Sequence, residues 1–193
     1  FFYLLWGRLA YDPKTPDSVW RNELGRRFGA AAADVLEVYR AASEVLTEIA
    51  AAHLADPNQY IWPEINPGGL IDAYIRVRPS DWRYVASIPE AVDNQIRGVA
   101  SAKQTPADTA ELLDGLALRI EQAAGRIGRT LPPSHWEWRG SEPDFRVLAA
   151  LARYHARKQV AAEQLAFFYR SGEPAALRTA RREAEAGVRV WKR

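Results

Sequence analysis

The stretch PDFRVLAALARYHARKQVAAEQLAFFYRS, residues Pro143–Ser171, decides the fold of this chain. It spans about 29 residues without a helix breaker after its first position, which corresponds to about 43 Å of α-helix. Its apolar residues recur at steps of three and four, the spacing of one helix face. This row consists of Val147, Leu151, Tyr154, Lys158, Ala161, Leu165 and Phe168. We therefore predict one continuous helix over residues 143–171.

A second helix is predicted directly after the first. Gly172 is a typical helix end, and Pro174 suits the first position of a new helix, where its missing N–H costs nothing. The new helix runs to Trp191, and its apolar face is Leu177, Ala180, Ala184, Val188 and Trp191. Because the connection at Gly172-Glu173 is short, the two helices should be antiparallel neighbours.

Helical patterns also cover most of the remaining chain. They predict helices over residues 1–10, 16–28, 30–55, 70–75 and 89–99, and a further helix that starts at Thr105-Pro106 and includes Leu112, Leu116, Ile120, Ala123 and Ile127. Thr15 and Thr105, each followed by proline, are the predicted N-caps. No period-2 strand pattern occurs. The predicted fold is all-α: an antiparallel helical bundle with an inserted loop rich in Trp, Tyr and Pro.

The N-terminal residues of the chain are unusually apolar. The sequence contains no methionine, and its first six residues, FFYLLW, are all apolar or aromatic, whereas a flexible terminus is usually polar. We expect residues 1–29 to continue from a missing upstream domain and to expose an apolar patch when isolated. Residues 30–193 should form the helical domain, with the aromatic loop 59–88 inserted in it.

Composition excludes several classes of protein. Of the 193 residues, 48% are hydrophobic and 26% are charged, as in globular domains, and there is no cysteine for a disulfide or a thiolate site. The net charge of +2 arises from interspersed signs, so we expect no nucleic-acid partner. No apolar run approaches the roughly 18 residues that would span a membrane.

The aromatic loop contains the candidate binding residues. We predict that Tyr60, Trp62, Glu64 and Trp82 contact substrate, because aromatic faces near a carboxylate are typical of sugar sites. The alternative is that Tyr60 and Trp62 only close one end of the bundle. We predict no catalytic residue, no metal site and no cofactor. The three histidines lack metal-ligand spacing, and no nucleophile elbow or phosphate loop occurs.

Lys158 is unusual because it lies within the apolar row of the long helix. Its amine either reaches outward to solvent or meets a carboxylate of a neighbouring helix, and a ligand contact is the less favoured alternative. The cations of the last helix, which are interrupted by Glu183 and Glu185, are interpreted as a solvated face rather than a nucleic-acid site. These cations are Arg178, Arg181, Arg182, Arg189, Lys192 and Arg193.

Two stretches resemble bacterial glycoside hydrolases of the α-glucuronidase-like and hexosaminidase-like kind. The first is LWGRLAYDP at residues 5–13, followed by Thr15-Pro16, Val19-Trp20 and Arg27-Phe28-Gly29. It is similar to a phrase that follows the catalytic barrel in those enzymes. The second resembles their long terminal helices and consists of Asp144, Leu148, Leu151, Tyr154, Lys158 and Ala161-Ala162, ending at Trp191.

This resemblance implies a (β/α)₈ barrel upstream that carries the catalytic acids. The present chain would then be the non-catalytic C-terminal helical domain, without the barrel, which supports the barrel and lines part of a sugar-binding cleft. Oligosaccharides or polysaccharides would be the ligands, and the periplasm or the extracellular space the location. The alternative hypothesis is a stand-alone helical module for protein–protein interaction or homodimerisation.

Overall fold

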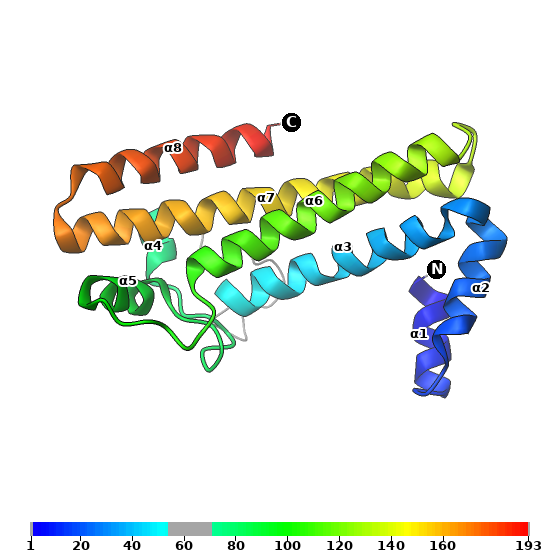
Figure 1. The fold of residues 1–193 in the computed structure, drawn as a ribbon, viewed down its shortest axis with the longest axis horizontal. Coiled ribbons are helices and arrows are strands. Elements are labelled where there is room, and N and C mark those ends of the chain that lie inside the picture. Colours follow the sequence, from blue (N-terminus) through cyan, green and yellow to red (C-terminus); the bar gives the residue numbers. More distant parts are fainter. Residues whose placement is uncertain (1, 54–70, 193) are drawn as a thin grey trace.

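A computed structural model describes residues 2–53 and 71–192 of the chain (Figure 1). Every regular element of the described part is helical, and its one strand-like feature is an isolated bridge between Val85 and Gln104. The all-α prediction is therefore confirmed. The elements are α1 (Phe2–Tyr11), α2 (Asp17–Phe28), the 3₁₀ helix η1 (Gly29–Ala31), α3 (Ala32–His53), α4 (Ile71–Ile75), α5 (Ile88–Arg97), α6 (Pro106–Thr130), α7 (Trp136–Ser171) and α8 (Pro174–Trp191).

The longest helix, α7, is the spine of the molecule. Helix α6 packs along it, and α3 packs against both (Figure 1). Helix α8 turns back at Gly172 and packs along the C-terminal half of α7, as the short connection predicted. Helices α4 and α5 also pack against α7.

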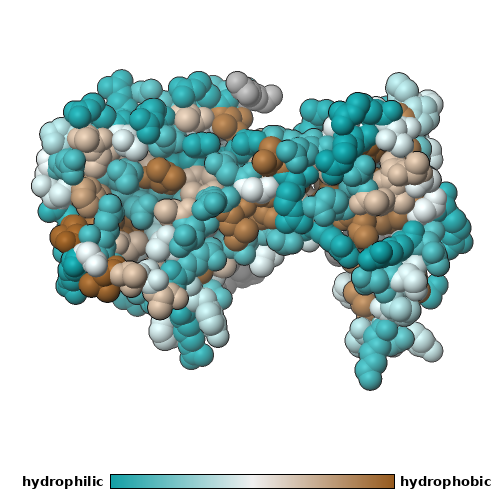
Figure 2. Space-filling model, viewed as in Figure 1, coloured by the Kyte–Doolittle hydropathy of each residue, from teal (hydrophilic) through white to brown (hydrophobic). Residues whose placement is uncertain are grey.

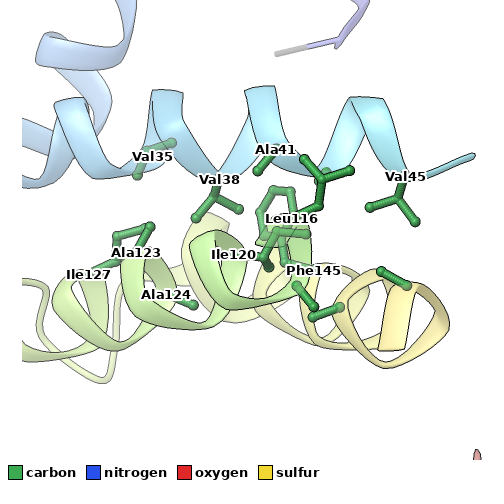
Figure 3. Close-up of a cluster of buried hydrophobic side chains, with 14 of the residues drawn as sticks. Val35, Val38, Ala41, Val45, Leu116, Ile120, Ala123, Ala124, Ile127 and Phe145 are labelled. Atoms are coloured by element: carbon green, nitrogen blue, oxygen red, sulfur yellow. The ribbon is translucent and has the colours of Figure 1, made fainter. Parts of the chain in front are cut away.

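The main core lies between α3, α6 and the N-terminal half of α7. Side chains of α3 meet those of α6 and the ring of Phe145 from α7 (Figure 3). The labelled residues of this interface are Val35, Val38, Ala41, Val45, Leu116, Ile120, Ala123, Ala124, Ile127 and Phe145. Complete burial of a side chain such as Val, Leu or Ile stabilises the fold by roughly 1.5–3 kcal/mol.

A smaller core holds α4 and α5 against the C-terminal half of α7. It consists of Tyr74, Ile75, Ile88, Val92, Ala162 and Ala166. Ser87 begins α5 with a side-chain cap, its Oγ accepting a hydrogen bond from the Glu90 N–H at 3.3 Å. The end of the bundle formed by α4, α5 and the C-terminal half of α7 therefore has a core of its own.

The two Thr-Pro sequences differ in the structure. Thr105 caps α6 through a capping box: its Oγ1 accepts a hydrogen bond from the Asp108 N–H at 3.1 Å, and Asp108 Oδ2 accepts one from the Thr105 N–H at 2.8 Å. The predicted cap at Thr15 is wrong. The Thr15 hydroxyl donates to the Asp12 carbonyl oxygen at 2.7 Å, and Pro16 takes the N-cap position of α2 without a side-chain cap.

The predicted start of the long helix at Pro143 is also wrong. Helix α7 begins at Trp136 and includes Pro143 in its interior. Contacts from outside the first two turns hold them in place. His135 caps the helix, accepting a hydrogen bond at Nδ1 from the Trp138 N–H at 3.3 Å, and stacks on Phe28 at 5.2 Å. Trp138 in turn stacks on Phe145, with ring centroids 5.9 Å apart.

Several large residues predicted to face inward lie at the surface instead. They are Leu112, Val147, Leu177, Val188 and Trp191. The inner face of α8 is made of Ala176, Ala180 and Gly187. A Cβ atom on Gly187 would lie 3.5 Å from Arg157 Cβ, so small residues allow α8 to lie close against α7.

Helices α1 and α2 form an arm that projects from one end of the elongated body (Figure 1). Trp20, Leu24 and Phe28 of α2 are buried. The chain then turns sharply at Gly29, which has φ 52°, a conformation that favours glycine. Helix α1, by contrast, makes hardly any packing contact with the other described helices.

Candidate functional site

Of the four predicted substrate-binding residues, the structure places Trp82. Tyr60, Trp62 and Glu64 lie outside the described residues. The short helix predicted at 70–75 is present as α4, and residues 76–87 connect it to α5. Trp82 lies in this connection and is 61% exposed, beside Tyr84, which is 71% exposed.

The segment 80–84, which we name the Trp82 tip, is fixed at both ends. Ser80 Oγ donates to the Ala50 carbonyl oxygen at 2.8 Å, near the C-terminus of α3. On the other side, the Gln104 N–H donates to the Tyr84 carbonyl oxygen at 2.8 Å. The Arg83 guanidinium carbon lies 5.4 Å from the centroid of the Trp82 ring. The tip therefore presents an exposed indole with the Arg83 guanidinium over its ring.

In the described part of the chain, Lys158 neither reaches outward to solvent nor meets a carboxylate, the two arrangements that its position in the apolar row suggested. It is partly buried and makes no ion pair within residues 2–53 and 71–192. Instead, its Nζ lies 4.0 Å from the centroid of the Tyr74 ring and 5.8 Å from that of the Tyr154 ring. Burial lowers the pKa of Lys158 to about 8. The lysine therefore joins α4 to α7 through cation–π contacts.

His155, one turn away on the same helix, is also buried. Its side chain is 1% exposed, and neither ring nitrogen has a hydrogen-bond partner in the part of the chain that the structure describes. Burial, helped by the charge of Lys158, lowers the pKa of His155 to about 3. The imidazole is therefore neutral across the physiological pH range.

A polar contact joins the C-terminal half of α3 to the segment before α6 and to its first turn. The Gln104 amide donates to Thr109 Oγ1 at 3.0 Å and to Glu48 Oε2 at 3.3 Å. Burial, followed by the charge of Asp108, raises the pKa of Glu163 in this region. The adjoining hollow measures about 10 Å³, which is about the space that one water needs. These groups stabilise the helix junction and leave no room for a substrate.

The described part of the chain contains neither a candidate metal site nor a helix suited to span a membrane. Among residues 2–53 and 71–192, no group of three or more His, Asp or Glu side chains could hold a metal. In the same ranges, no helix has the length and apolar character needed to cross a bilayer. The described cations of α8 are exposed, and Arg181 pairs with Glu185 at 2.8 Å.

The most distinctive surface of the described chain belongs to α1. This helix has the sequence FYLLWGRLAY, with Arg8 as its single charged residue. Tyr3 is 85% exposed, Trp6 66% and Tyr11 94%. A helix that is apolar nearly all round is normally buried. The exposed aromatic face of α1 is therefore unusual for a solvent-facing protein surface.

Comparisons with known proteins give no further assignment. No protein-family model, no curated protein and no solved structure matches this chain.

Proposed function

We propose that this chain is a non-catalytic helical domain of a carbohydrate-active enzyme, and that it docks on the catalytic domain through α1. The observation that carries the proposal is the exposed, almost uncharged face of α1 formed by Tyr3, Trp6 and Tyr11. Burial of such a face against a second domain gains about 25 cal/mol per Å² of apolar surface.

The kind of partner rests on the resemblance of residues 5–29 to the phrase that follows the barrel in glycoside hydrolases. That phrase includes Trp6 and Leu9 of α1 and Trp20 and Phe28 of α2. In the structure, Trp20 and Phe28 are buried within the chain, whereas Trp6 and Leu9 face solvent. The phrase therefore contains both the anchor of the arm in the bundle and its outward face.

The Trp82 tip supports a role beside a sugar cleft. An exposed indole on a fixed segment offers a flat apolar surface, and the Arg83 guanidinium lies over its ring. Xylohexaose, cellohexaose and chitohexaose are suitable probes for nuclear magnetic resonance. The proposal predicts shifts at Trp82 with at least one of them. It also predicts that Trp82→Ala abolishes the accompanying shifts of the other amides in the Trp82 tip, while Trp136→Ala, which changes another exposed Trp, leaves them intact.

The reading frame that precedes the codon for Phe1 tests the proposal directly. The proposal predicts that it encodes a (β/α)₈ barrel with acidic residues at two strand ends. A reading frame without a barrel would overturn it. The purified chain should also leave 4-nitrophenyl glycosides intact, and hydrolysis by the chain alone would contradict the non-catalytic role.

The same face of α1 also favours the second candidate, a homodimerisation module. Size-exclusion chromatography with light scattering separates the two. A module that pairs α1 with α1 gives a stable dimer at micromolar concentration, and Trp6→Ser converts it to a monomer. The docking role predicts instead weak association that rises continuously with concentration.

A further inference from the structure

A groove lies in the angle between α2 and α3, where the arm leaves the body; we name it the elbow groove. Figure 2 shows the arm standing away from the body. The groove measures about 360 Å³ and is lined by Arg21, Ala32, Ala33, Leu36, Glu37 and Arg40. This volume is at the lower end of the range for small-molecule sites, roughly 300–1,000 Å³.

The groove follows from the residues at the start of α3. Gly29 turns the chain, and Ala31 faces the core with 0% exposure. Ala32 and Ala33, the next two residues, carry only methyl groups and therefore leave the angle between the helices unfilled. Leu36, one turn later, completes an apolar floor. Because the packing of Leu24 and Phe28 in the main core fixes α2 against α3, the groove exists without a ligand.

Two guanidinium groups border this floor. Arg21 forms no ion pair within the described ranges. Arg40 Nη2 lies 3.6 Å from Asp17 Oδ2, and both side chains are more than half exposed. The remaining acid, Glu37, accepts a 2.7 Å hydrogen bond from Arg119 Nε on α6. The groove therefore combines an apolar floor with an excess of positive charge.

We propose that the elbow groove binds a small organic carboxylate with an apolar body. Arg21 and Arg40 bind the carboxylate, since a guanidinium donates two parallel hydrogen bonds to its oxygens. Ala32, Ala33 and Leu36 contact the apolar body. The loosely held Asp17 carboxylate gives up its contact with Arg40 when the ligand enters. This site does not depend on the proposed role in a carbohydrate-active enzyme.

The test is a titration of the whole chain, observed by nuclear magnetic resonance, with hexanoate, hexan-1-ol and sulfate as probes. Hexanoate should shift the methyl signals of Ala32 and Ala33 and the Nε–H of Arg21 in a saturable way. Binding of hexan-1-ol and of sulfate should each be at least tenfold weaker, because each offers half of the recognised chemistry. The absence of saturable shifts with hexanoate, or equal binding of sulfate, would overturn the proposal.

Variants locate the site. Arg21→Gln should weaken hexanoate binding at least tenfold. Ala33→Leu should abolish it by filling the floor, without loss of the fold, because Ala33 is exposed. Arg26→Gln is the matched control on the same helix: Arg26 pairs with Glu23 and lies outside the groove lining, so binding should stay unchanged. Circular dichroism confirms that each variant is folded, and wild-type binding by Arg21→Gln would contradict the assignment.

A blocked Leu-Glu-Leu tripeptide distinguishes a free acid from a partner's side chain. The proposal predicts that hexanoate binds more tightly than the tripeptide, because the peptide flanks do not fit a hollow of about 360 Å³. Tighter binding of the tripeptide would overturn the small-molecule assignment in favour of an acidic segment of another protein.

Discussion

At the scale of single residues, Lys158 shows most clearly that contacts between residues distant in sequence determine the environment of a side chain. Its position in the apolar row of α7 indicated an unusual cation. The aromatic partner Tyr74, however, comes from α4, 84 residues earlier in the numbering. No local pattern links the two, and the sequence therefore predicted an outward-reaching or ion-paired lysine.

The burial of Lys158 predicts that removal of its charge stabilises the fold. Lys158→Met keeps most of the volume and avoids the cost of desolvating an ammonium, with a net gain of about 1 kcal/mol at pH 6 after the loss of the cation–π contacts. The folded-state pKa of about 8 lies below the ordinary value of 10.5. The wild type therefore gains stability as the pH rises from 8 to 10.5, and the advantage of the variant shrinks over that range.

Urea unfolding of both proteins at pH 6, 8 and 10 measures this difference. A variant that is less stable than the wild type at pH 6 would show that the cation–π contacts outweigh the desolvation cost.

His155 predicts a loss of stability in acid. The unfolded chain takes up a proton at the ordinary pKa of 6.5, whereas the folded chain keeps the imidazole neutral down to about pH 3. Acid therefore favours the unfolded state, by up to about 1.4 kcal/mol per pH unit between these values. His155→Leu should remove this component. Unfolding free energies of variant and wild type that fall in parallel from pH 6.5 to 3.5 would contradict the buried neutral histidine.

At the scale of helices, the two Thr-Pro starts form a natural pair for a capping test. Thr105→Ala removes the hydroxyl that accepts from the Asp108 N–H, and should cost about 1 kcal/mol of unfolding free energy. Thr15→Ala removes only a hydrogen bond within an exposed turn, and should cost under about 0.5 kcal/mol. Chemical denaturation measures both, and equal losses would contradict the capping box.

Pro143 lies on the exposed side of α7, where its ring removes the hydrogen bond to the Arg139 carbonyl oxygen. Pro143→Ala restores the donor and should raise the unfolding free energy by about 1–3 kcal/mol. The matched control is Pro174→Ala at the first turn of α8, where proline is well accepted and the change should be near zero. A loss of stability in Pro143→Ala would contradict the expectation that the proline weakens the helix.

Local signals predicted most of the helices correctly, because their causes lie within a few residues. The N-cap at Thr105, the turn at Gly172 and the short helix α4 are examples. The inner face of α6 was predicted correctly at Leu116, Ile120, Ala123 and Ile127 but not at Leu112, and the inner face of α8 was predicted less well. Leu113 rather than Leu112 is fully buried, and Ala176, Ala180 and Gly187 rather than Leu177 and Val188 meet α7. Where two helices approach closely, the smaller residues face inward and the larger ones face solvent. How closely the helices approach is set by the assembled bundle and is not visible in a local sequence pattern.

At the scale of the whole molecule, the fold consists of a well-packed body and an arm whose helix α2 is anchored in the main core. Of the predicted binding residues, Trp82 lies in the connection between α4 and α5. Its exposure and the fixed ends of the tip depend on contacts with α3 and with Gln104, which no local pattern reveals. The elbow groove likewise depends on the angle between two helices and on alanines that are unremarkable in sequence.

The separation of body and arm predicts opposite responses to substitution. Ile120→Ala in the main core should cost about 2–5 kcal/mol. Trp6→Ser in α1 should change the unfolding free energy by less than about 0.5 kcal/mol and should reduce the binding of an apolar dye. Thermal unfolding and dye fluorescence test both, and a destabilisation by Trp6→Ser comparable to that of Ile120→Ala would place α1 within the core.

Amide hydrogen exchange of the monomeric chain tests most directly whether α1 is a docking element that lies outside the packed core. The predicted result is rapid exchange throughout α1 and slow exchange in α3, α6 and α7, since packing protects backbone hydrogen bonds from opening. Protection of α1 equal to that of α3, at a concentration where light scattering shows a monomer, would contradict the docking role.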